Sequence, residues 1–170
     1  TLFIDGVSFS TPVTHLLTGP EVTAGSFNFT IASGAGWGVD GTHLLNMNIT
    51  DAAGNVGAVG GDVNVILDTT APTSPNNAVV VNAASNGINA VEQTAGVLVT
   101  IDLSGTNALA NDRVEVLLGG VAFTTPVFHT LSAAEILAGS ANATIQLGSG
   151  WGTDGVKTIA ARVVDLAGNI

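Results

Sequence analysis

The chain contains an internal repeat. Residues 6–56 align without a gap with residues 120–170, at an offset of 114 positions, and 25 of the 51 aligned pairs are identical. Self-similarity at a fixed period is typical of chains built from similar structural units in series. A chain of 170 residues therefore holds roughly one and a half such units. We expect residues 1–68 to be the C-terminal part of one module and residues 69–170 to be a second module without its last strand.

The boundary between these modules is expected in the segment that runs from Asp68 to Pro75. This segment contains Pro72 and Pro75 among small polar residues, and it interrupts the alternation of apolar side chains on either side. Because proline restricts the backbone, we expect a short, stiff linker.

Apolar and polar residues alternate in both modules, as in half-buried β-strands. In the first module the pattern covers residues 26–31 and 45–49, and the aligned residues 140–145 and 159–163 repeat it. Further strands are expected at Val97–Leu103, Val114–Leu118, Val63–Leu67 and Val79–Val81. No window has the pattern of a long amphipathic helix, although Leu131–Ala138 suits a single helical turn. The sequence therefore predicts an all-β fold.

The length of the period favours one all-β architecture. A module of 114 residues with short strands has the size of an immunoglobulin-like β-sandwich. We expect each complete module to contain two antiparallel sheets, Greek-key connections and about seven strands.

The charge of the chain excludes several classes of partner. Thirteen acidic residues and three basic ones give a net charge of -10, and this balance disfavours binding to nucleic acid. There is no cysteine for a disulfide or a zinc–thiolate site. No apolar run reaches about 18 residues, so we expect no membrane span in this fragment. The chain has no initiator Met or export signal, and we expect it to be part of something longer. Its carboxylates suit calcium, a hard cation with oxygen ligands.

Three short motifs give the chain a family resemblance. Asp-x-x-Gly-Asn occurs at Asp51–Asn55 and again at Asp165–Asn169, Leu-Asp-Thr-Thr-Ala-Pro at Leu67–Pro72, and Gly-Ile-Asn-Ala-Val-Glu at Gly87–Glu92. Together they resemble the bacterial immunoglobulin-like repeats of large type I secreted RTX adhesins and biofilm-associated proteins. The resemblance implies extracellular arrays of extender modules that calcium stiffens at their junctions. This chain lacks the nonapeptide repeats and the ligand-binding domain of such proteins, so the adhesion ligand is undetermined.

Candidate calcium ligands follow from where an immunoglobulin fold places its loops. Asp165 and Asn169 belong to the expected FG turn of the second module, at the end where the linker residue Asp68 enters. Asp112 belongs to the BC loop at that same end, and Asp40 belongs to the EF loop of the first module, which faces the linker. By repeat symmetry, the preceding and following junctions would use Asp51, Asn55, Asp154 and Glu92, the last together with Asn89. The alternative is that Asp-x-x-Gly-Asn is turn chemistry alone, because Asp accepts hydrogen bonds from its own loop.

Other conspicuous side chains are expected to be structural. His15 and His129 occupy one repeat position in separate modules, and His43, which aligns with Lys157, is expected to face solvent. The aligned Trp37 and Trp151 are expected to cover the ends of the sandwiches. No nucleophile motif or paired carboxylates are recognisable, so we do not expect an enzyme.

The repeat favours a mechanical function. We expect a non-catalytic extender region of a bacterial cell-surface adhesin, which supports cell adhesion or biofilm formation and has neighbouring modules of the same polypeptide as its partners. One alternative is a self-assembling extracellular fibre in which identical subunits exchange strands. The other is a carbohydrate-binding accessory module, which would require Trp37 and Trp151 to be exposed.

Overall fold

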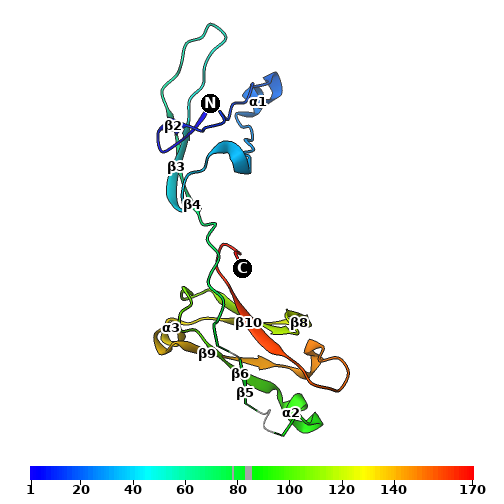
Figure 1. Cartoon of the computed structure of the whole chain (residues 1–170). Helices are drawn as coiled ribbons and strands as arrows, with labels where there is room; N and C mark the ends of the chain where they lie inside the picture. Colours follow the sequence, from blue (N-terminus) through cyan, green and yellow to red (C-terminus); the bar gives the residue numbers. More distant parts are fainter. Residues whose placement is uncertain (78, 83–85) are drawn as a thin grey trace. The chain divides into compact units, whose positions relative to one another are not determined.

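The structure is a computed structural model that describes residues 1–77, 79–82 and 86–170. The chain divides into two compact units, Thr1–Thr69 and Thr70–Ile170, here called unit 1 and unit 2. Among the described residues, the strands form three antiparallel sheets, and the helices are short (Figure 1). The fold is therefore mostly β, as the apolar alternation predicts. None of the described helices is long and apolar enough to cross a bilayer.

Unit 1 contains one four-stranded sheet in the order β2-β1-β3-β4. Its elements are β1 Leu2–Ile4, β2 Val7–Ser8, the helix α1 Gly19–Ala24, the 3-10 turn η1 Ser33–Ala35, β3 Gly41–Met47 and β4 Gly60–Leu67. Its buried core is small and consists of Leu2, Ile4, Phe9 and Ala35. Partly buried side chains pack against this core, among them Phe29, Ile31 and Trp37.

Unit 2 contains two three-stranded sheets, in the orders β10-β7-β8 and β5-β6-β9. Its elements are β5 Val80–Val81, α2 Ala90–Ala95, β6 Val97–Asp102, β7 Arg113–Leu118, β8 Val121–Thr130, α3 Ala133–Ala138, β9 Ser140–Ile145, η2 Leu147–Ser149 and β10 Ile159–Val164. Side chains from both sheets form a single buried cluster, which includes Ile101 and Ile145 from one sheet and Val116 and Val163 from the other. The two sheets therefore bury one face of each against a common core.

The short elements of the two units correspond in sequence position. The helices α1 and α3 lie 114 residues apart, as do the turns η1 and η2. Gly36 and Gly150, which end these turns, both have a φ of 94°. At Gly36 a Cβ atom would lie 2.2 Å from Ser10 Oγ, and at Gly150 it would lie 2.7 Å from Thr124 Oγ1. Glycine is required at this repeat position both for the positive φ and for the close approach.

The structure corrects three expectations about secondary structure. Residues 26–31 form no strand, whereas the aligned residues 140–145 form β9. The helices α1 and α2 were not expected, because six residues are too few to show a helical period. The strand β8 was not expected either. It contains Pro126, which lies where pairing with β7 shifts register between Val116 and Leu117, so its missing N–H costs no ladder hydrogen bond.

Candidate metal-binding loops

The Asp51–Asn55 loop in unit 1 is a tight turn organised by one carboxylate. Asp51 Oδ1 accepts hydrogen bonds from the backbone N–H groups of Ala53, at 2.9 Å, and Asn55, at 2.8 Å. Asp51 Oδ2 accepts a third from Asn55 Nδ2 at 2.8 Å. The hydrogen bonds from Asn55 are the main reason that the pKa of Asp51 lies below its ordinary value. An isolated β-bridge between Thr50 and Val56 closes the loop.

The Asp165–Asn169 loop in unit 2 has the same arrangement. Asp165 Oδ1 accepts from the backbone N–H of Asn169 at 2.8 Å, and Oδ2 accepts from Asn169 Nδ2 at 2.7 Å. Desolvation is the largest influence on the Asp165 pKa and raises it, but the hydrogen bonds from Asn169, Gly168 and Ala167 together outweigh it and lower the pKa. Both loops therefore hold an ionised aspartate within a hydrogen-bonded turn.

The chemistry of these carboxylates fits calcium only in part. An ionised carboxylate offers about four acceptor sites, and the turn already occupies three of them at Asp51. The acceptor site that remains on the carboxylate can contact a cation through one oxygen. Calcium needs about 6–8 oxygen ligands. Within the described residues, no group of three or more His, Asp or Glu side chains lies close enough to hold a metal ion. Backbone carbonyls, amide oxygens and water would have to supply the other ligands.

Two further predicted ligands, Asp40 and Asp68, lie at one end of unit 1. Asp40 Oδ1 accepts hydrogen bonds from Thr69, from the backbone N–H at 3.0 Å and from the side-chain hydroxyl at 2.7 Å. The bend that contains Asp40 is thereby tied to the residue that follows Asp68, and both aspartates are exposed.

The remaining predicted ligands lie in unit 2 and have different surroundings. Asp112 is only 4% exposed, and its Oδ2 accepts from the backbone N–H of Leu109 at 2.7 Å. Asp154 lies exposed in a bend before β10. Glu92 forms a capping box at the start of α2, where its carboxylate accepts from the backbone N–H of Asn89 at 2.9 Å. Asp112 and Glu92 thus satisfy backbone donors, a role that sequence reasoning did not assign to them.

Two histidine–glutamate pairs were also missed at the sequence level. His15 Nε2 lies 2.9 Å from Glu21 Oε1, and at the equivalent position His129 Nε2 lies 2.7 Å from Glu135 Oε1. Both glutamates belong to capping boxes. The sequence pattern that could have predicted their position is a Thr or Ser three residues before the Glu. Hydrogen bonds from Thr18 and from His15 lower the pKa of Glu21 to about 2.

His43 was expected to face solvent, and this expectation is wrong. The residue is 8% exposed, with Nδ1 2.7 Å from Asp5 Oδ2 and Nε2 2.8 Å from the Val39 carbonyl oxygen. Because both ring nitrogens face acceptors, the protonated ring is favoured, and the hydrogen bond to Asp5 raises the pKa of His43. The alignment with Lys157 was misleading because Asp5 aligns with Gly119, so unit 2 has no equivalent pair.

The two tryptophans pack against their own units. Trp151 is 7% exposed and contacts Phe123 edge-on, with ring centroids 5.6 Å apart. Trp37 contacts Phe9 in the same way at 5.7 Å. This packing leaves the Trp151 indole covered, whereas a sugar-binding platform requires an exposed ring face.

No protein-family model, curated protein or solved structure matches this chain.

Proposed function

We propose that the chain is a non-catalytic extender segment of an extracellular bacterial adhesin, built from immunoglobulin-like modules in series. The observation that carries this proposal is the recurrence of α1, η1 and the Asp51–Asn55 loop as α3, η2 and the Asp165–Asn169 loop, each at an offset of 114 residues. Similar units repeated along one chain produce length, and length is what an extender contributes to adhesion or biofilm formation.

The strand orders support the immunoglobulin-like assignment. The sheet β5-β6-β9 has the order expected for strands A, B and E of such a sandwich, and β8-β7-β10 has the order C′, C and F. In unit 1 the strand β4 pairs with β3 and thus occupies the position of strand G. Unit 2 shares this pattern up to strand F, and unit 1 shares it from strand C onward.

Calcium at the module junctions is the second part of the proposal. Ligands at one side of a junction would come from Asp165 and Asn169 of the expected FG turn. Asp112 of the expected BC loop would contribute at that same side. Asp40 and Asp68 would contribute them at the other, and Asp51 with Asn55 would serve the equivalent position in the neighbouring junction. A bound cation would offset part of the net charge of -10 and stiffen the array.

Calcium titration of the full chain tests this part. Thermal unfolding and small-angle scattering are measured in chelator and in millimolar calcium, with magnesium chloride at equal ionic strength as a control for screening. We expect calcium to raise the melting temperature, because a ligand at 100 times its Kd adds about 2.7 kcal/mol.

Matched variants identify the ligands. Asp165→Asn keeps an acceptor oxygen for the Asn169 N–H but loses the charge, so it should weaken the calcium response. Asp62→Asn alters an exposed aspartate on β4 outside the candidate set and should leave the response unchanged. Equal unfolding curves in chelator and in calcium would contradict the junction sites, although not the serial modules.

A second candidate function is a self-assembling fibre completed by strand exchange. One observation favours it, namely that residues 26–31 of unit 1 have no paired strand although the aligned β9 has one. In such a fibre identical subunits would supply the missing strands. Sedimentation of the full chain over a range of concentrations separates the two candidates, because only the fibre predicts growth beyond a monomer.

A further inference from the structure

Unit 2 contains a chemically reactive pair of residues in the loop between β5 and α2. Asn86–Gly87 is the one place in the sequence where a glycine follows an asparagine. The backbone nitrogen of the next residue can attack the side-chain carbonyl carbon of an asparagine and close a five-membered ring, which makes asparagine a labile residue. Glycine favours this step because it has no Cβ to hinder the approach. Ring closure is therefore more favourable at Asn86 than at other asparagines.

The structure leaves this pair open to the reaction. Both residues are exposed, and Asn86 lies in a bend outside any strand or helix. Gly87 has a φ of 90°, and a Cβ atom built on it would have no neighbouring atom within 4 Å. Within residues 1–77, 79–82 and 86–170, no hydrogen bond holds the Asn86 side chain. The amide can therefore turn toward the Gly87 nitrogen without breaking a contact.

The residues that follow the pair are held in place. Ile88 packs against the core of unit 2. The Asn89 side chain caps α2, where its Oδ1 accepts hydrogen bonds from the backbone N–H groups of Val91, at 2.9 Å, and Glu92, at 3.0 Å. Asn89 thus lies only three positions from Asn86, but its side chain is already engaged. The two asparagines provide a contrast within a single loop.

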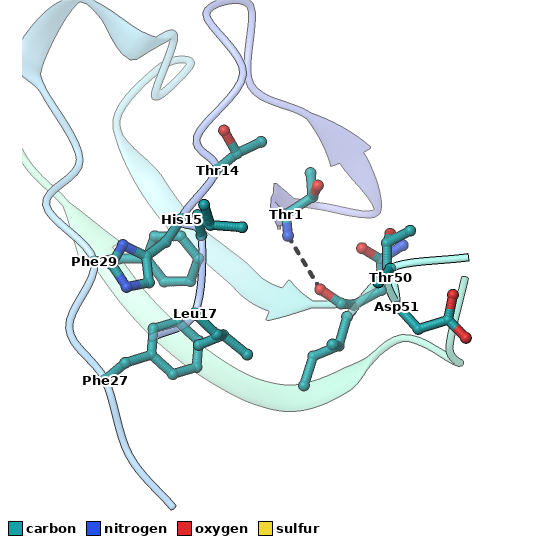
Figure 2. A pocket seen from close by; sticks show the side chains of 12 residues that line it. Thr1, Thr14, His15, Leu17, Phe27, Phe29, Thr50 and Asp51 are labelled. Carbon is teal, nitrogen blue, oxygen red and sulfur yellow. Dashed lines mark hydrogen bonds between the residues drawn. The ribbon is translucent and has the colours of Figure 1, made fainter. Parts of the chain in front are cut away.

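Other asparagines lack the combination found at Asn86. Each of them precedes a residue with a Cβ atom, which hinders ring closure. Several are also hydrogen-bonded, as at Asn169, where Nδ2 donates to Asp165 Oδ2 at 2.7 Å. Asn48, in the wall of a cleft in unit 1, precedes the branched Ile49, and its backbone carbonyl accepts a hydrogen bond from the amino group of Thr1 at 3.0 Å (Figure 2). Reaction at such sites first requires local opening of the fold.

Three aspartates also precede a glycine, namely Asp5, Asp40 and Asp154. An ionised carboxylate resists attack by a nitrogen, so an aspartate must first take up a proton. At Asp5 the hydrogen bonds from His43 and from the Leu44 N–H keep the pKa of the carboxyl below its ordinary value. Ring closure and reopening at an aspartate also leave the mass of the chain unchanged. A change in mass therefore distinguishes reaction at Asn86 from reaction at these aspartates.

From these contrasts we propose that Asn86 is a self-modification site, at which the side chain converts to aspartate and isoaspartate without an enzyme. The Gly87 nitrogen loses its proton and bonds to Asn86 Cγ, the Cγ–Nδ2 bond breaks, and the side-chain nitrogen leaves as ammonia. Water then opens the ring at one of its two carbonyl carbons. Opening at Cγ gives aspartate, and opening at the main-chain carbon gives isoaspartate. Water is the one co-reactant.

The modification changes both the charge and the backbone of the loop. Either product adds a negative charge to a chain whose net charge is -10, in the segment that leads into α2. Isoaspartate also lengthens the main chain by a methylene group just before Ile88, which the core holds. Because the reaction needs no partner, the converted fraction rises with time after synthesis. The charge of a population of chains thereby records its age.

Incubation of the full chain tests the proposal. The folded protein is kept in neutral and in mildly alkaline buffer, and samples taken over time are separated by charge and mapped by mass spectrometry. We expect a gain of about 1 Da at Asn86. The rate should rise with pH, because the attacking nitrogen must lose its proton. Hydroxylamine, which cleaves the cyclic intermediate, should split the folded chain between Asn86 and Gly87.

The same incubation in urea tests the contribution of the structure. Since the loop is already open in the folded chain, unfolding should change the rate at Asn86 by less than about three-fold. Conversion at the hydrogen-bonded asparagines should instead accelerate by more than that. Conversion at Asn86 that begins only in urea would overturn the proposal.

Matched variants separate the two residues of the site. Asn86→Gln keeps an amide but would require a six-membered ring, and Gly87→Ala keeps Asn86 but adds a Cβ atom. Each should slow ammonia release by about ten-fold or more. Asn64→Gln removes an exposed asparagine of β4 that precedes the branched Val65, and it should leave the release unchanged. Release that persists in Asn86→Gln would overturn the assignment. None of these outcomes depends on whether the chain belongs to an adhesin.

Discussion

Units 1 and 2 are two versions of one repeat with different amounts of surrounding structure. The short elements form in both: the helices α1 and α3 each end at a glycine in the left-handed conformation, and the two Asp-x-x-Gly-Asn loops have the same hydrogen bonds. The longer strands differ, because β9 is present only where β6 pairs with it. Caps and turns are stabilised by residues within about five positions, whereas a strand needs a partner from elsewhere in the chain.

The largest expected difference between the units is in the stability lost when the isoleucine at one repeat position, Ile31 or Ile145, is replaced. Ile145 is fully buried, whereas Ile31 is only partly buried. Replacing Ile145 with alanine should cost about 2–5 kcal/mol through the cavity left in the core of unit 2. Replacing Ile31 should cost about 1 kcal/mol or less. Equal costs would mean that unit 1 has a complete core after all.

Each unit has one tryptophan, so the two unfolding reactions can be read separately in the full chain. Denaturant unfolding of unit 2 is followed through Trp151 in a Trp37→Phe background, and that of unit 1 through Trp37 in a Trp151→Phe background. Each tryptophan is thus replaced only in the unit that is not being read.

A buried charge gives the second contrast. Glu115 is 3% exposed and accepts a hydrogen bond from Arg162 Nε at 2.7 Å. Arg162→Ala leaves this carboxylate without its cation and should cost about 3 kcal/mol. Glu115→Gln in addition should recover part of that loss. The aligned Asn48→Ala in unit 1 should cost far less, because within the described residues the Asn48 side-chain oxygen has no hydrogen-bond partner. Similar losses for Arg162 and Asn48 in urea titrations would refute this contrast.

The Asp-x-x-Gly-Asn loops should behave alike. Asp51→Ala and Asp165→Ala each remove the acceptor that organises a turn, and each should lower the stability of its own unit by a similar, small amount. The measurement is the shift in unfolding midpoint without calcium. A clearly larger loss at Asp165 alone would show that this loop has a tertiary role that the Asp51 loop lacks.

The smallest expected effect is a dependence on pH that the His43–Asp5 pair gives to unit 1. The pKa of His43 is raised from 6.5, so the protonated pair with Asp5 stabilises the fold fully below that value and is lost as the pH rises through the raised pKa. The pKa of Asp5 is lowered from 3.8, so its contribution is lost as the pH falls through that lowered pKa. Unit 1 should therefore be most stable between about pH 4 and 6.5.

His43→Gln tests this pH dependence. Glutamine keeps a polar side chain but does not titrate, so the midpoint of unit 1 should become flatter with pH between 6 and 8. A variant that follows the same pH curve as the unaltered chain would show that His43 does not set it.

The comparison also explains what the sequence could predict. Strands such as β6, β7 and β9 were predictable because alternating apolar residues report the burial that a strand will have. The same alternation at residues 26–31 predicted a strand wrongly, since a pattern says nothing about whether a partner is present. His43 was misjudged because its environment depends on Asp5, 38 positions away and not repeated. The candidate calcium ligands remain predictions, since their assembly depends on contacts that no single loop contains.

The interrupted pairing of β8 with β7 affects whether neighbouring molecules can add to the edge of this sheet. This strand lies at the border of its sheet, where unsatisfied backbone groups can recruit a neighbouring molecule into uncontrolled aggregation. Pro126 removes one donor there, and the shift in pairing bends the strand away from a flat template. Many such chains packed side by side would therefore stay separate along this border. The repeat has a proline at the same position in unit 1, Pro12, although no strand forms there.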